Sequence, residues 1–443
     1  MSLPDRFSLL VLGQGTTGLD VVSRSLEASG VEFVYGTELV QGSYDVCVAS
    51  PGISEFSEFF GSARAASVQI MGEPEFAWRL SPQRWCGITG TNGKTTTTSL
   101  TQHLLRSSGM TASAVGNIGM TAISAVDSRS QGDWLVAELS SYQLATTCEL
   151  HPRVSVLLNI TPDHLAWHRS HDNYARAKIS LFKNMDRDDL AIVDVEDDGI
   201  NAYRDQIFVS GRRVLSVSFE DPGTADAAFV RDGVLTVRLA DDETSLVSAG
   251  ELKIFGHHNV INALAASAAA LACGATAVGV REGLKMFAPL EHRVEPCGEL
   301  DGVRYVNDSK ATNTDAVLKA LTAFPQDRVI LLLGGHDKGT PLDEFAEQVA
   351  AQVGAVVCFG EARERFRHAL EETEGASDID IAVASDLCDA VDVARSLAGR
   401  GDVVLLSPAC SSFDEFSGFE ERGRRFKAYL QELRDHAAEV EMD

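Results

Sequence analysis

A glycine-rich loop at residues 90–95, Gly90-Thr91-Asn92-Gly93-Lys94-Thr95, most constrains what this chain can fold into. The apolar run at residues 85–89 predicts a strand before the loop, and a helix is expected from Thr96 onward. In such a unit the backbone N–H groups of the loop face the helix N-terminus, where they can hold a phosphate. Lys94 would neutralise phosphate charge, and Thr95 offers the hydroxyl that holds Mg2+ in loops of this kind. We therefore expect an enzyme that uses ATP.

The spacing of this loop differs from the common GxxxxGK[ST] pattern. Ile88 stands where that pattern has its first glycine. We interpret the difference as the mark of a subclass of phosphate-binding loops, with a purely structural glycine loop as the alternative.

Short apolar runs alternate with helical stretches along the whole chain, which is typical of βαβ units and parallel sheets. Further strands are expected at residues 8–12, 45–49, 134–137, 154–159, 190–193, 328–333, 355–358 and 402–406. Between Val214 and Lys253, short alternating segments predict an antiparallel insertion. The expected fold class is α/β.

The chain has 443 residues, and single domains usually have roughly 150, so two or three domains are expected. One boundary is placed at Ser81-Pro82, where a mononucleotide-like unit ends, and another near Pro289. The predicted division is a Rossmann-like domain at 1–82, a P-loop ATPase-like central domain at 83–289 and a Rossmann-like domain at 290–443.

Composition narrows the range of partners. The formal net charge is −26 and no run of lysine or arginine interrupts the acidic background, which argues against nucleic acid and against an anionic membrane. The weakly polar stretch at residues 260–280 is mostly alanine and is expected to be a buried helix, not a membrane span. The eight cysteines lack CxxC spacing, and no export signal is visible, so a cytoplasmic protein is expected.

Polar side chains follow two of the predicted strands. Glu138 ends the strand at residues 134–137 and is a candidate Mg2+ ligand, with a solvated strand-end carboxylate as the alternative. His164 follows the strand at residues 154–159 and would reach the same edge. A zinc site of His164, His168 and His171 is disfavoured, because no cysteine or glutamate completes a tetrahedral set.

A second glycine motif lies near the N-terminus. Residues 13–18, Gly-Gln-Gly-Thr-Thr-Gly, match GxGxxG after an expected strand. The acidic residue that would hold a ribose is missing at the end of the next expected strand, residues 31–34, which argues against NAD. A diphosphate-bearing nucleotide-sugar fits the same backbone geometry. ATP energy would then be applied to a nucleotide-linked substrate.

Many segments in order resemble the Mur ligase family, over nearly the whole chain. They are residues 87–95 and 116–119, Glu138-Leu-Ser-Ser-Tyr-Gln143, Asn159-Ile-Thr-Pro-Asp-His164, Tyr174-Ala-Arg-Ala-Lys178, Gly256-His-His-Asn-Val-Ile-Asn-Ala263, His292-Arg293, Asn307-Asp-Ser-Lys-Ala-Thr312, Gly334-Gly-His-Asp-Lys338 and Ser407-Pro-Ala-Cys-Ser-Ser-Phe-Asp414. Within the family, the runs at 138–143 and 407–414 favour the branch that adds D-glutamate.

The resemblance implies ligation of D-glutamate to UDP-N-acetylmuramoyl-L-alanine through an acyl phosphate, giving an amide, ADP and phosphate. This reaction belongs to cytoplasmic peptidoglycan precursor synthesis, and a monomer is expected. It further implies two Mg2+ ions, one held by Thr95 and Glu138 and one by His164 and Lys178. Lys178, which lies in an expected helix at residues 173–184, would act as a carbamate, because a carbamylated amine becomes a carboxylate-like ligand.

The resemblance also assigns the other site residues. Implied catalytic residues are Lys94, His164, Lys178 and Lys310. ATP contacts are Gly90, Thr91, Asn92, Gly93, Lys94, Thr95, Thr96, Asn259, Asn262, Arg293 and Asp308. UDP-sugar contacts are Gly15, Thr16, Thr17, Thr37, Gly52, Asn117 and His164. Amino-acid contacts are Thr312, Lys338, Ser412, Phe413 and Phe419.

The chain departs from its relatives at two places. His336 stands where some relatives carry an acid, and Gly36-Thr37-Glu38 replaces an Asp-Thr-Arg run near the uracil. The alternatives left open are a sister ligase that adds another amino acid or extends folate's glutamate tail, a dinucleotide oxidoreductase and a non-catalytic binding protein.

Overall fold

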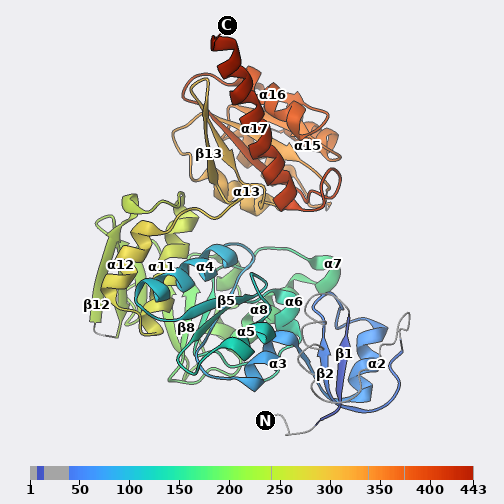
Figure 1. Cartoon of the computed structure of the whole chain (residues 1–443), viewed down its shortest axis with the longest axis vertical. Helices are drawn as coiled ribbons and strands as arrows, with labels where there is room; N and C mark the ends of the chain where they lie inside the picture. The colour runs from blue at the N-terminus through green and yellow to red at the C-terminus, as the bar shows by residue number, and fades with distance from the viewer. Residues whose placement is uncertain (1–6, 14–38, 241, 338, 374, 443) are drawn as a thin grey trace. The chain divides into compact units, whose positions relative to one another are not determined.

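A computed structural model describes residues 7–13, 39–240, 242–337, 339–373 and 375–442. Within them the strands form three sheets of three, nine and six strands, most of them paired in parallel (Figure 1). The predicted α/β class is therefore confirmed.

The first sheet has the order β1-β2-β3, and both pairings are parallel. Its strands are β1 (Leu9–Leu12), β2 (Tyr44–Ala49) and β3 (Ser67–Gly72), followed or separated by α2 (Glu58–Ala66) and α3 (Glu73–Leu80). The Ser57 side chain accepts a hydrogen bond from the Phe60 N–H and so caps α2. The strand predicted at residues 31–34 lies outside the described residues.

The second sheet has the order β12-β11-β10-β9-β8-β7-β4-β6-β5. Its parallel strands are β4 (Trp85–Thr89), β5 (Ala112–Gly116), β6 (Trp134–Glu138), β7 (Val154–Leu157), β8 (Leu190–Asp194) and β9 (Arg213–Val217). Because β4 lies between β6 and β7, the loops after these three strands open at one edge, where α/β sheets bind ligands.

The predicted antiparallel insertion extends this sheet. It consists of β10 (Ala227–Arg231), β11 (Val234–Leu239) and β12 (Asp242–Ser248), with β10–β11 and β11–β12 antiparallel. Asp232 and Gly233 both have positive φ (51° and 78°), which is the two-residue turn that suits a β-hairpin.

Helices and short 3-10 turns connect the strands of the second sheet. They are α4 (Lys94–Ser107), α5 (Ala122–Ser128), α6 (Ser141–Ala145), α7 (Leu165–His168), α8 (His171–Ile179), η1 (Ser180–Phe182), α9 (Asp198–Asn201), α10 (Arg204–Ile207), η2 (Ala249–Glu251), α11 (His257–Ala272) and α12 (Ala277–Met286). Among the described residues, none of these or the later helices has the length and apolarity needed to cross a membrane.

Two predicted helices have different bounds. The helix expected at residues 173–184 is α8, which begins at His171 because Ser170 caps it, and ends at Ile179 in a 3-10 turn. The helix expected at residues 260–280 is two helices, because Gly274 turns the chain with φ +100° between α11 and α12.

The third sheet has the order β13-β14-β18-β15-β16-β17, parallel except for β13. The strands are β13 (Glu295–Leu300), β14 (Val303–Asn307), β15 (Val329–Gly334), β16 (Ala355–Phe359), β17 (Asp380–Val383) and β18 (Val403–Ala409). The helices are α13 (Thr314–Leu321), α14 (Asp343–Ala350), α15 (Arg363–Glu371), η3 (Ala376–Asp378), α16 (Leu387–Leu397) and α17 (Phe419–Met442).

Both faces of the third sheet are buried, which explains its continuous apolar strands. Leu331 and Leu333 face a core with Val317, Phe345 and Phe366, from α13, α14 and α15. Ile330 and Leu332 face the opposite core, which α16 and α17 cover (Figure 1).

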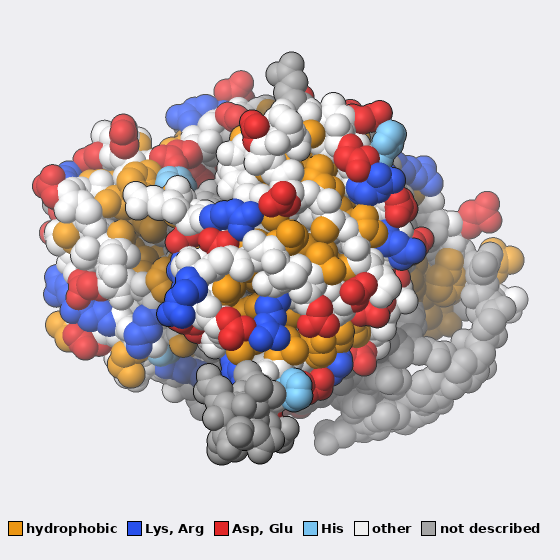
Figure 2. All heavy atoms as spheres, turned by 90° about the horizontal axis from the view of Figure 1, so that it is seen from above, with side chains coloured by type: hydrophobic (Ala, Val, Ile, Leu, Met, Phe, Trp, Pro, Cys, Tyr) orange, Lys and Arg blue, Asp and Glu red, His pale blue; other side chains and the backbone are white. Residues whose placement is uncertain are grey.

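The chain divides into two compact units, residues 1–252 with 260–287, and residues 253–259 with 288–443. The finer division into domains 1–82, 83–289 and 290–443 stays a prediction. On the face shown in Figure 2, acidic and basic side chains are interspersed, as on an ordinary solvated surface.

Candidate functional site

The glycine-rich loop turns sharply from β4 into α4. Gly93 caps the helix with φ +81°, and a Cβ at this position would lie 2.5 Å from Asn262 Oδ1. Only glycine fits both the backbone conformation and the space. The loop therefore approaches α11 closely, and Asn262 also accepts a hydrogen bond from Thr97 Oγ1 at 3.3 Å.

Two lysines meet over this loop. Lys94 Nζ donates to the carbonyls of Gly90 and Thr91 at 2.9 and 2.8 Å, and Lys178 Nζ donates to the same Gly90 carbonyl at 2.6 Å. Lys178 is buried, and its Nζ lies 4.6 Å from the centroid of the Tyr174 ring. Burial, together with the Lys94 charge, holds the pKa of Lys178 well below its usual range.

A buried carboxylate lies at the end of β6. Glu138 is 2% exposed, and its Oε1 accepts a hydrogen bond from Asn117 Nδ2 at 2.9 Å. Its Oε2 is buried and has no hydrogen-bond partner among the described residues. A buried carboxylate oxygen without a partner is costly, and a hard cation would satisfy it.

His164 lies at the start of α7, with φ +53°. Its ring is exposed, its centroid lies 4.8 Å from that of the Tyr142 ring, and its Nε2 lies 3.5 Å from Asp163 Oδ2. His168 is fully buried instead, and its Nε2 pairs with Ser141 Oγ at 2.9 Å. Burial lowers the pKa of His168 to about 4, so it is a neutral packing residue among aromatic rings.

The other residues of the loop are held by the segment after β7. Thr91 Oγ1 donates to Thr161 O at 3.1 Å, and Asn92 N donates to Asn159 Oδ1 at 2.7 Å. Thr95 is half-buried in the first turn of α4, and Thr96 is buried behind it.

The first sheet contributes an open cavity of about 440 Å3, lined by Gly52, Ile53, Ser54, Ser57, Glu58 and Phe59. Of the predicted UDP-sugar contacts, Gly52 lines this cavity and Asn117 and His164 lie at the β4–β6–β7 edge. Gly15, Thr16, Thr17 and Thr37 lie outside the described residues.

A second group of predicted residues gathers in the unit that contains the third sheet. Asp308, at the end of β14, is buried and accepts hydrogen bonds from Ser407 Oγ at 2.8 Å and Val294 N at 3.2 Å. Burial raises the pKa of Asp308 to about 7, against the lowering effect of these bonds. His292, earlier in the chain, is also buried, and its Nδ1 lies 2.9 Å from Asn307 Nδ2.

Lys310 and Phe419 are in direct contact. Lys310 Nζ lies 3.6 Å from the centroid of the Phe419 ring, a short cation–π contact. The Phe419 carbonyl accepts a hydrogen bond from Ser309 Oγ at 2.8 Å, so the start of α17 is fastened to the loop after β14.

Sequence reasoning missed Arg422, which organises this group. Its guanidinium is fully buried and donates to Ser309 Oγ and Ser309 O at 3.0 and 2.8 Å, and to Cys410 O at 3.0 Å. A fourth bond reaches Ser411 O at 3.3 Å. Arg422 therefore joins the loops after β14 and β18. Arg422 belongs to no recognised motif and lies 113 residues from Ser309 in the sequence, so the sequence carries no signal of this role.

The remaining residues predicted to contact the amino acid or the nucleotide occupy varied environments. Ser412 is buried beside the Arg422 contacts, Thr312 is half-buried, and the Phe413 side chain is 71% exposed. Arg293 is half-buried, and Asn259 Nδ2 donates to Phe255 O at 2.7 Å. Lys338 lies outside the described residues.

His336, where some relatives carry an acid, forms an ion pair. Its Nδ1 lies 2.7 Å from Glu361 Oε2, and the pKa of His336 is raised by this contact. His336 N donates to Ser411 O at 2.8 Å and Ser411 Oγ donates to His336 O at 3.2 Å, which joins the loops after β15 and β18.

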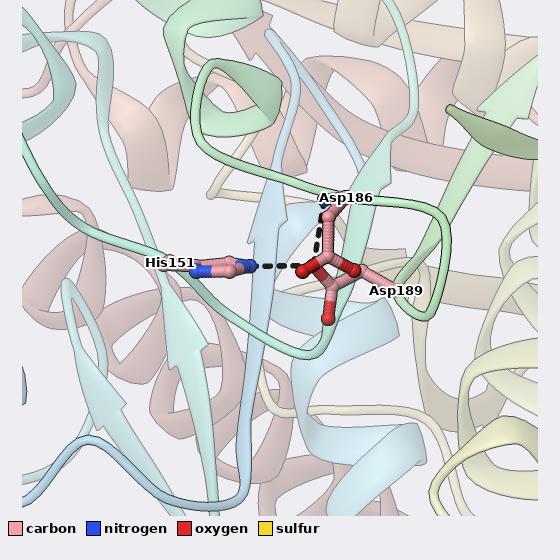
Figure 3. A group of neighbouring side chains, drawn as sticks. All are labelled: His151, Asp186 and Asp189. Carbon is pink, nitrogen blue, oxygen red and sulfur yellow. Dashed lines mark hydrogen bonds and ion pairs between the residues drawn. The ribbon is translucent and has the colours of Figure 1, made fainter. Parts of the chain in front are cut away.

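One group of potential metal ligands lies apart from these motifs, at His151, Asp186 and Asp189 (Figure 3). Asp189 Oδ2 lies 2.5 Å from His151 Nε2 and accepts the Asp186 N–H at 2.9 Å, while Arg153 lies 3.7 Å from the other oxygen. These partners satisfy Asp189, so the group fastens the loop before β8. The His164, His168 and His171 set does not form such a group among the described residues.

Two family models match separate parts of the chain. The model for the Mur ligase middle domain matches residues 88–270, and the model for the Mur ligase glutamate ligase domain matches residues 292–410. The UDP-N-acetylmuramoylalanine–D-glutamate ligase of Thermoanaerobacter pseudethanolicus is 36% identical over 440 residues, covering 97% of this chain and 94% of the relative. The enzyme of the same name from Salinibacter ruber is 38% identical over 422 residues, covering 94% and 90%.

Solved structures agree on the fold. A MurF ligase from Thermotoga maritima in complex with ADP has a TM-score of 0.59 at 18% identity and covers 96% of this chain and 95% of its own. A pseudomurein peptide ligase type C from Methanothermus fervidus has a TM-score of 0.61 at 18% identity, covering 88% and 87%. From the two matching domain models and the full-length relatives, we conclude that the chain belongs to the Mur ligase family.

Proposed function

We propose that the chain ligates D-glutamate to UDP-N-acetylmuramoyl-L-alanine at the expense of ATP, in the synthesis of peptidoglycan precursors. The observation that carries this proposal is the 36% identity to a D-glutamate ligase over 97% of the chain. The placement of Lys94, Glu138, His164 and Lys178 around one edge of the second sheet supports it.

The proposed reaction has two steps. A carboxylate oxygen of the UDP-linked substrate attacks the γ-phosphorus of ATP, forming an acyl phosphate and releasing ADP. The amine of D-glutamate then attacks the acyl carbon, loses a proton and expels inorganic phosphate. Both steps bring anions together, so cations and N–H donors must offset the repulsion.

The loop residues are suited to the first step. Lys94 is held at the loop by the Gly90 and Thr91 carbonyls, from which it can turn to a phosphate oxygen. The N–H groups at the start of α4 add the positive end of the helix dipole. The close approach of Gly93 to Asn262 leaves no room for a side chain at the start of α4.

Two groups with carboxylate-type oxygens would each hold a Mg2+ ion: Glu138, and Lys178 as its carbamate. The Oε2 of Glu138, which has no hydrogen-bond partner in the part of the chain that the structure describes, fits a metal ligand, with Thr95 as the hydroxyl partner on α4. When bound, Mg2+ supplies positive charge to the phosphate oxygens. Asn117 fixes the Glu138 carboxylate in one orientation through its bond to Oε1.

Lys178 would act as a carbamate beside His164. Carbamate formation requires a neutral amine, and burial next to Lys94 lowers the pKa of Lys178 in the direction that provides one. The amine nitrogen adds to the carbon of CO2 and loses a proton, which turns a cationic group into an anionic ligand. The Tyr174 ring lies beside this amine, with its centroid 4.6 Å from Nζ.

The third sheet would receive the amino acid and part of the ATP. Lys310, Thr312, Lys338, Ser412, Phe413 and Phe419 are proposed for the amino acid and catalysis, and Asn259, Arg293 and Asp308 for ATP. Lys310 and Phe419 touch each other, and Arg422 fixes the two loops that carry Ser309 and Ser412. We also propose a monomer in the cytoplasm, which size-exclusion chromatography and cell fractionation would test.

The decisive assay measures phosphate release from ATP with UDP-N-acetylmuramoyl-L-alanine and each of D-glutamate, L-glutamate, L-alanine, L-lysine and diaminopimelate. Release that requires both D-glutamate and the UDP-linked substrate is the expected result. Release driven equally by another amino acid, or by a folate in place of the UDP-linked substrate, would assign the chain to a sister ligase.

A further inference from the structure

The loop that lines the cavity of the first sheet is fastened to α7 of the second sheet. Arg169, directly after α7, donates from Nη2 to the Phe56 carbonyl at 3.0 Å. Its guanidinium carbon also lies 4.5 Å from the centroid of the Phe56 ring. Two residues earlier, the Trp167 carbonyl accepts a hydrogen bond from Ser54 Oγ at 3.3 Å. Side chain and backbone thus make three contacts with residues 54–56.

These contacts act directly on the cavity wall. Ser54 and Ser57 line the cavity, and Phe56 lies between them. The same short segment is turned by the bond from Ser57 Oγ to Ser54 O at 2.8 Å and by the Ser57 cap on α2. Fixing Phe56 therefore fixes both serines and the start of α2.

At its other end, α7 carries His164. The helix is only four residues long, from Leu165 to His168, and left-handed residues bound it at His164 (φ +53°) and Arg169 (φ +65°). Arg169 N donates to Leu165 O at 2.8 Å, and buried His168 pairs with Ser141, so the turn is firmly held. The N–H groups of Trp167 and His168 both donate to the His164 carbonyl at 3.1 Å, so the turn links Arg169 to His164.

We propose that Arg169 is a positioning residue for the UDP-linked substrate, which holds the cavity loop at residues 52–59 in register with His164. This inference rests on the proposed function, in which the nucleotide end of the substrate binds at the first sheet and its carboxylate reacts near His164. Arg169 itself touches neither end of the substrate. It acts through Phe56, so that the loop is ordered before the substrate arrives.

The test compares kinetic constants of Arg169→Ala with those of the wild type. Loss of a charge-assisted bond and a cation–π contact at an exposed site predicts a rise in the KM for UDP-N-acetylmuramoyl-L-alanine of roughly threefold to tenfold. The KM values for ATP and D-glutamate and the kcat should stay within about twofold, because the phosphate loop and the third sheet are untouched. Arg169→Lys should recover part of the loss, since an ammonium can still lie over the ring and donate to the carbonyl.

Arg176→Ala is the matched control, because Arg176 is an exposed arginine on the neighbouring helix α8 and forms its ion pair with Asp172, on the same helix. Its kinetic constants should equal those of the wild type. Phe56→Leu, which removes the ring and keeps the carbonyl, should raise the same KM by a smaller factor.

Three results would overturn the inference: an unchanged KM for the UDP-linked substrate in Arg169→Ala, an equal rise in all three KM values, or, if Arg169→Ala does not fold, an unchanged KM in Phe56→Leu. Each presupposes a wild type that releases phosphate in response to D-glutamate. A wild type without that response would instead refute the proposed function.

Discussion

The environment of the single residue Glu138 supports its proposed role as a metal ligand. Its carboxylate is removed from water, yet only one oxygen has a hydrogen-bond partner among the described residues. Burying this oxygen without a partner lowers the stability of the folded protein, and a bound cation would offset that loss.

Replacing Glu138 by glutamine should uncouple Mg2+ from this site. A ligand that binds only the folded state raises its melting temperature, so Mg2+ with ADP should stabilise the wild type. In Glu138→Gln we expect that stabilisation to be lost and kcat to fall by about 100-fold or more, because a neutral amide is a poor Mg2+ ligand. Thermal unfolding with and without Mg2+ and ADP measures the first effect.

Asp194→Asn is the control for that experiment, since Asp194 ends the nearby strand β8 and its Oδ1 already accepts the Glu196 N–H. It should keep the full response to Mg2+. An equal response in Glu138→Gln would contradict the metal assignment.

The raised pKa of Asp308 predicts that the stability of the folded protein depends on pH. Its pKa is raised to about 7 in the folded protein, whereas the pKa of an unfolded aspartate is about 3.9. Between these values the folded state keeps a proton that the unfolded state loses, so this residue makes stability fall as pH rises from about 4 to about 7. The slope has a limit of about 1.4 kcal/mol per pH unit for one proton.

Asp308→Asn should remove this component, because the amide does not titrate in that range and its oxygen can still accept from Ser407. Urea unfolding of both proteins at several pH values between about 4.5 and about 7.5 spans the window in which the two protonation states differ. The stability of the variant relative to the wild type should increase with pH; a constant difference would show that Asp308 ionises normally.

At the scale of elements, the turn from β4 into α4 depends on Gly93. An alanine there would be strained by φ +81° and would place its Cβ 2.5 Å from Asn262 Oδ1. Gly109 offers a matched control, since its φ is +78° and a Cβ there would have nothing within 4 Å. Gly93→Ala should therefore cost about 2 kcal/mol or more of unfolding free energy, and Gly109→Ala about 1 kcal/mol. If chemical denaturation gives the two variants equal losses of unfolding free energy, α11 must have moved to make room for the added methyl group at residue 93.

Arg422 joins the loops after β14 and β18 through buried bonds to Ser309, Cys410 and Ser411. Arg422→Ala leaves several of these oxygens without a donor and should destabilise the protein by about 3 kcal/mol or more. In Arg422→Lys, a folded protein with a raised KM for D-glutamate is expected, because an ammonium cannot reproduce the fork. Arg425→Ala removes an exposed pair with Glu432, a ring contact with Tyr429 and an interaction with Cys388, but leaves no buried carbonyl without its donor, so it should cost less than about 1 kcal/mol. Unaltered stability in Arg422→Ala would refute the role of Arg422.

The sequence predicts those elements whose signal is local. The strand and loop at residues 85–95 and the antiparallel hairpins appear where periodicity and glycine spacing place them. The break at Gly274 was missed, because alanine-rich sequence continues on both sides and one glycine competes weakly with it. The links from Arg422 to Ser309 and from Arg169 to Phe56 each span 113 residues, so tertiary packing alone reveals them.

At the scale of the whole molecule, the proposed reaction draws on both compact units. One unit contains the phosphate loop, Glu138, His164 and Lys178, and the other contains Asp308, Lys310 and Ser412. In the proposed reaction, ATP activates the carboxylate as an acyl phosphate, which the amine of D-glutamate then attacks.

Transfer of 18O from the substrate carboxylate tests this central claim most directly. With both carboxylate oxygens of UDP-N-acetylmuramoyl-L-alanine labelled, ATP and D-glutamate should yield inorganic phosphate that carries one 18O for each amide formed, as read by mass spectrometry. Amide formation accompanied by unlabelled phosphate would contradict the acyl-phosphate intermediate.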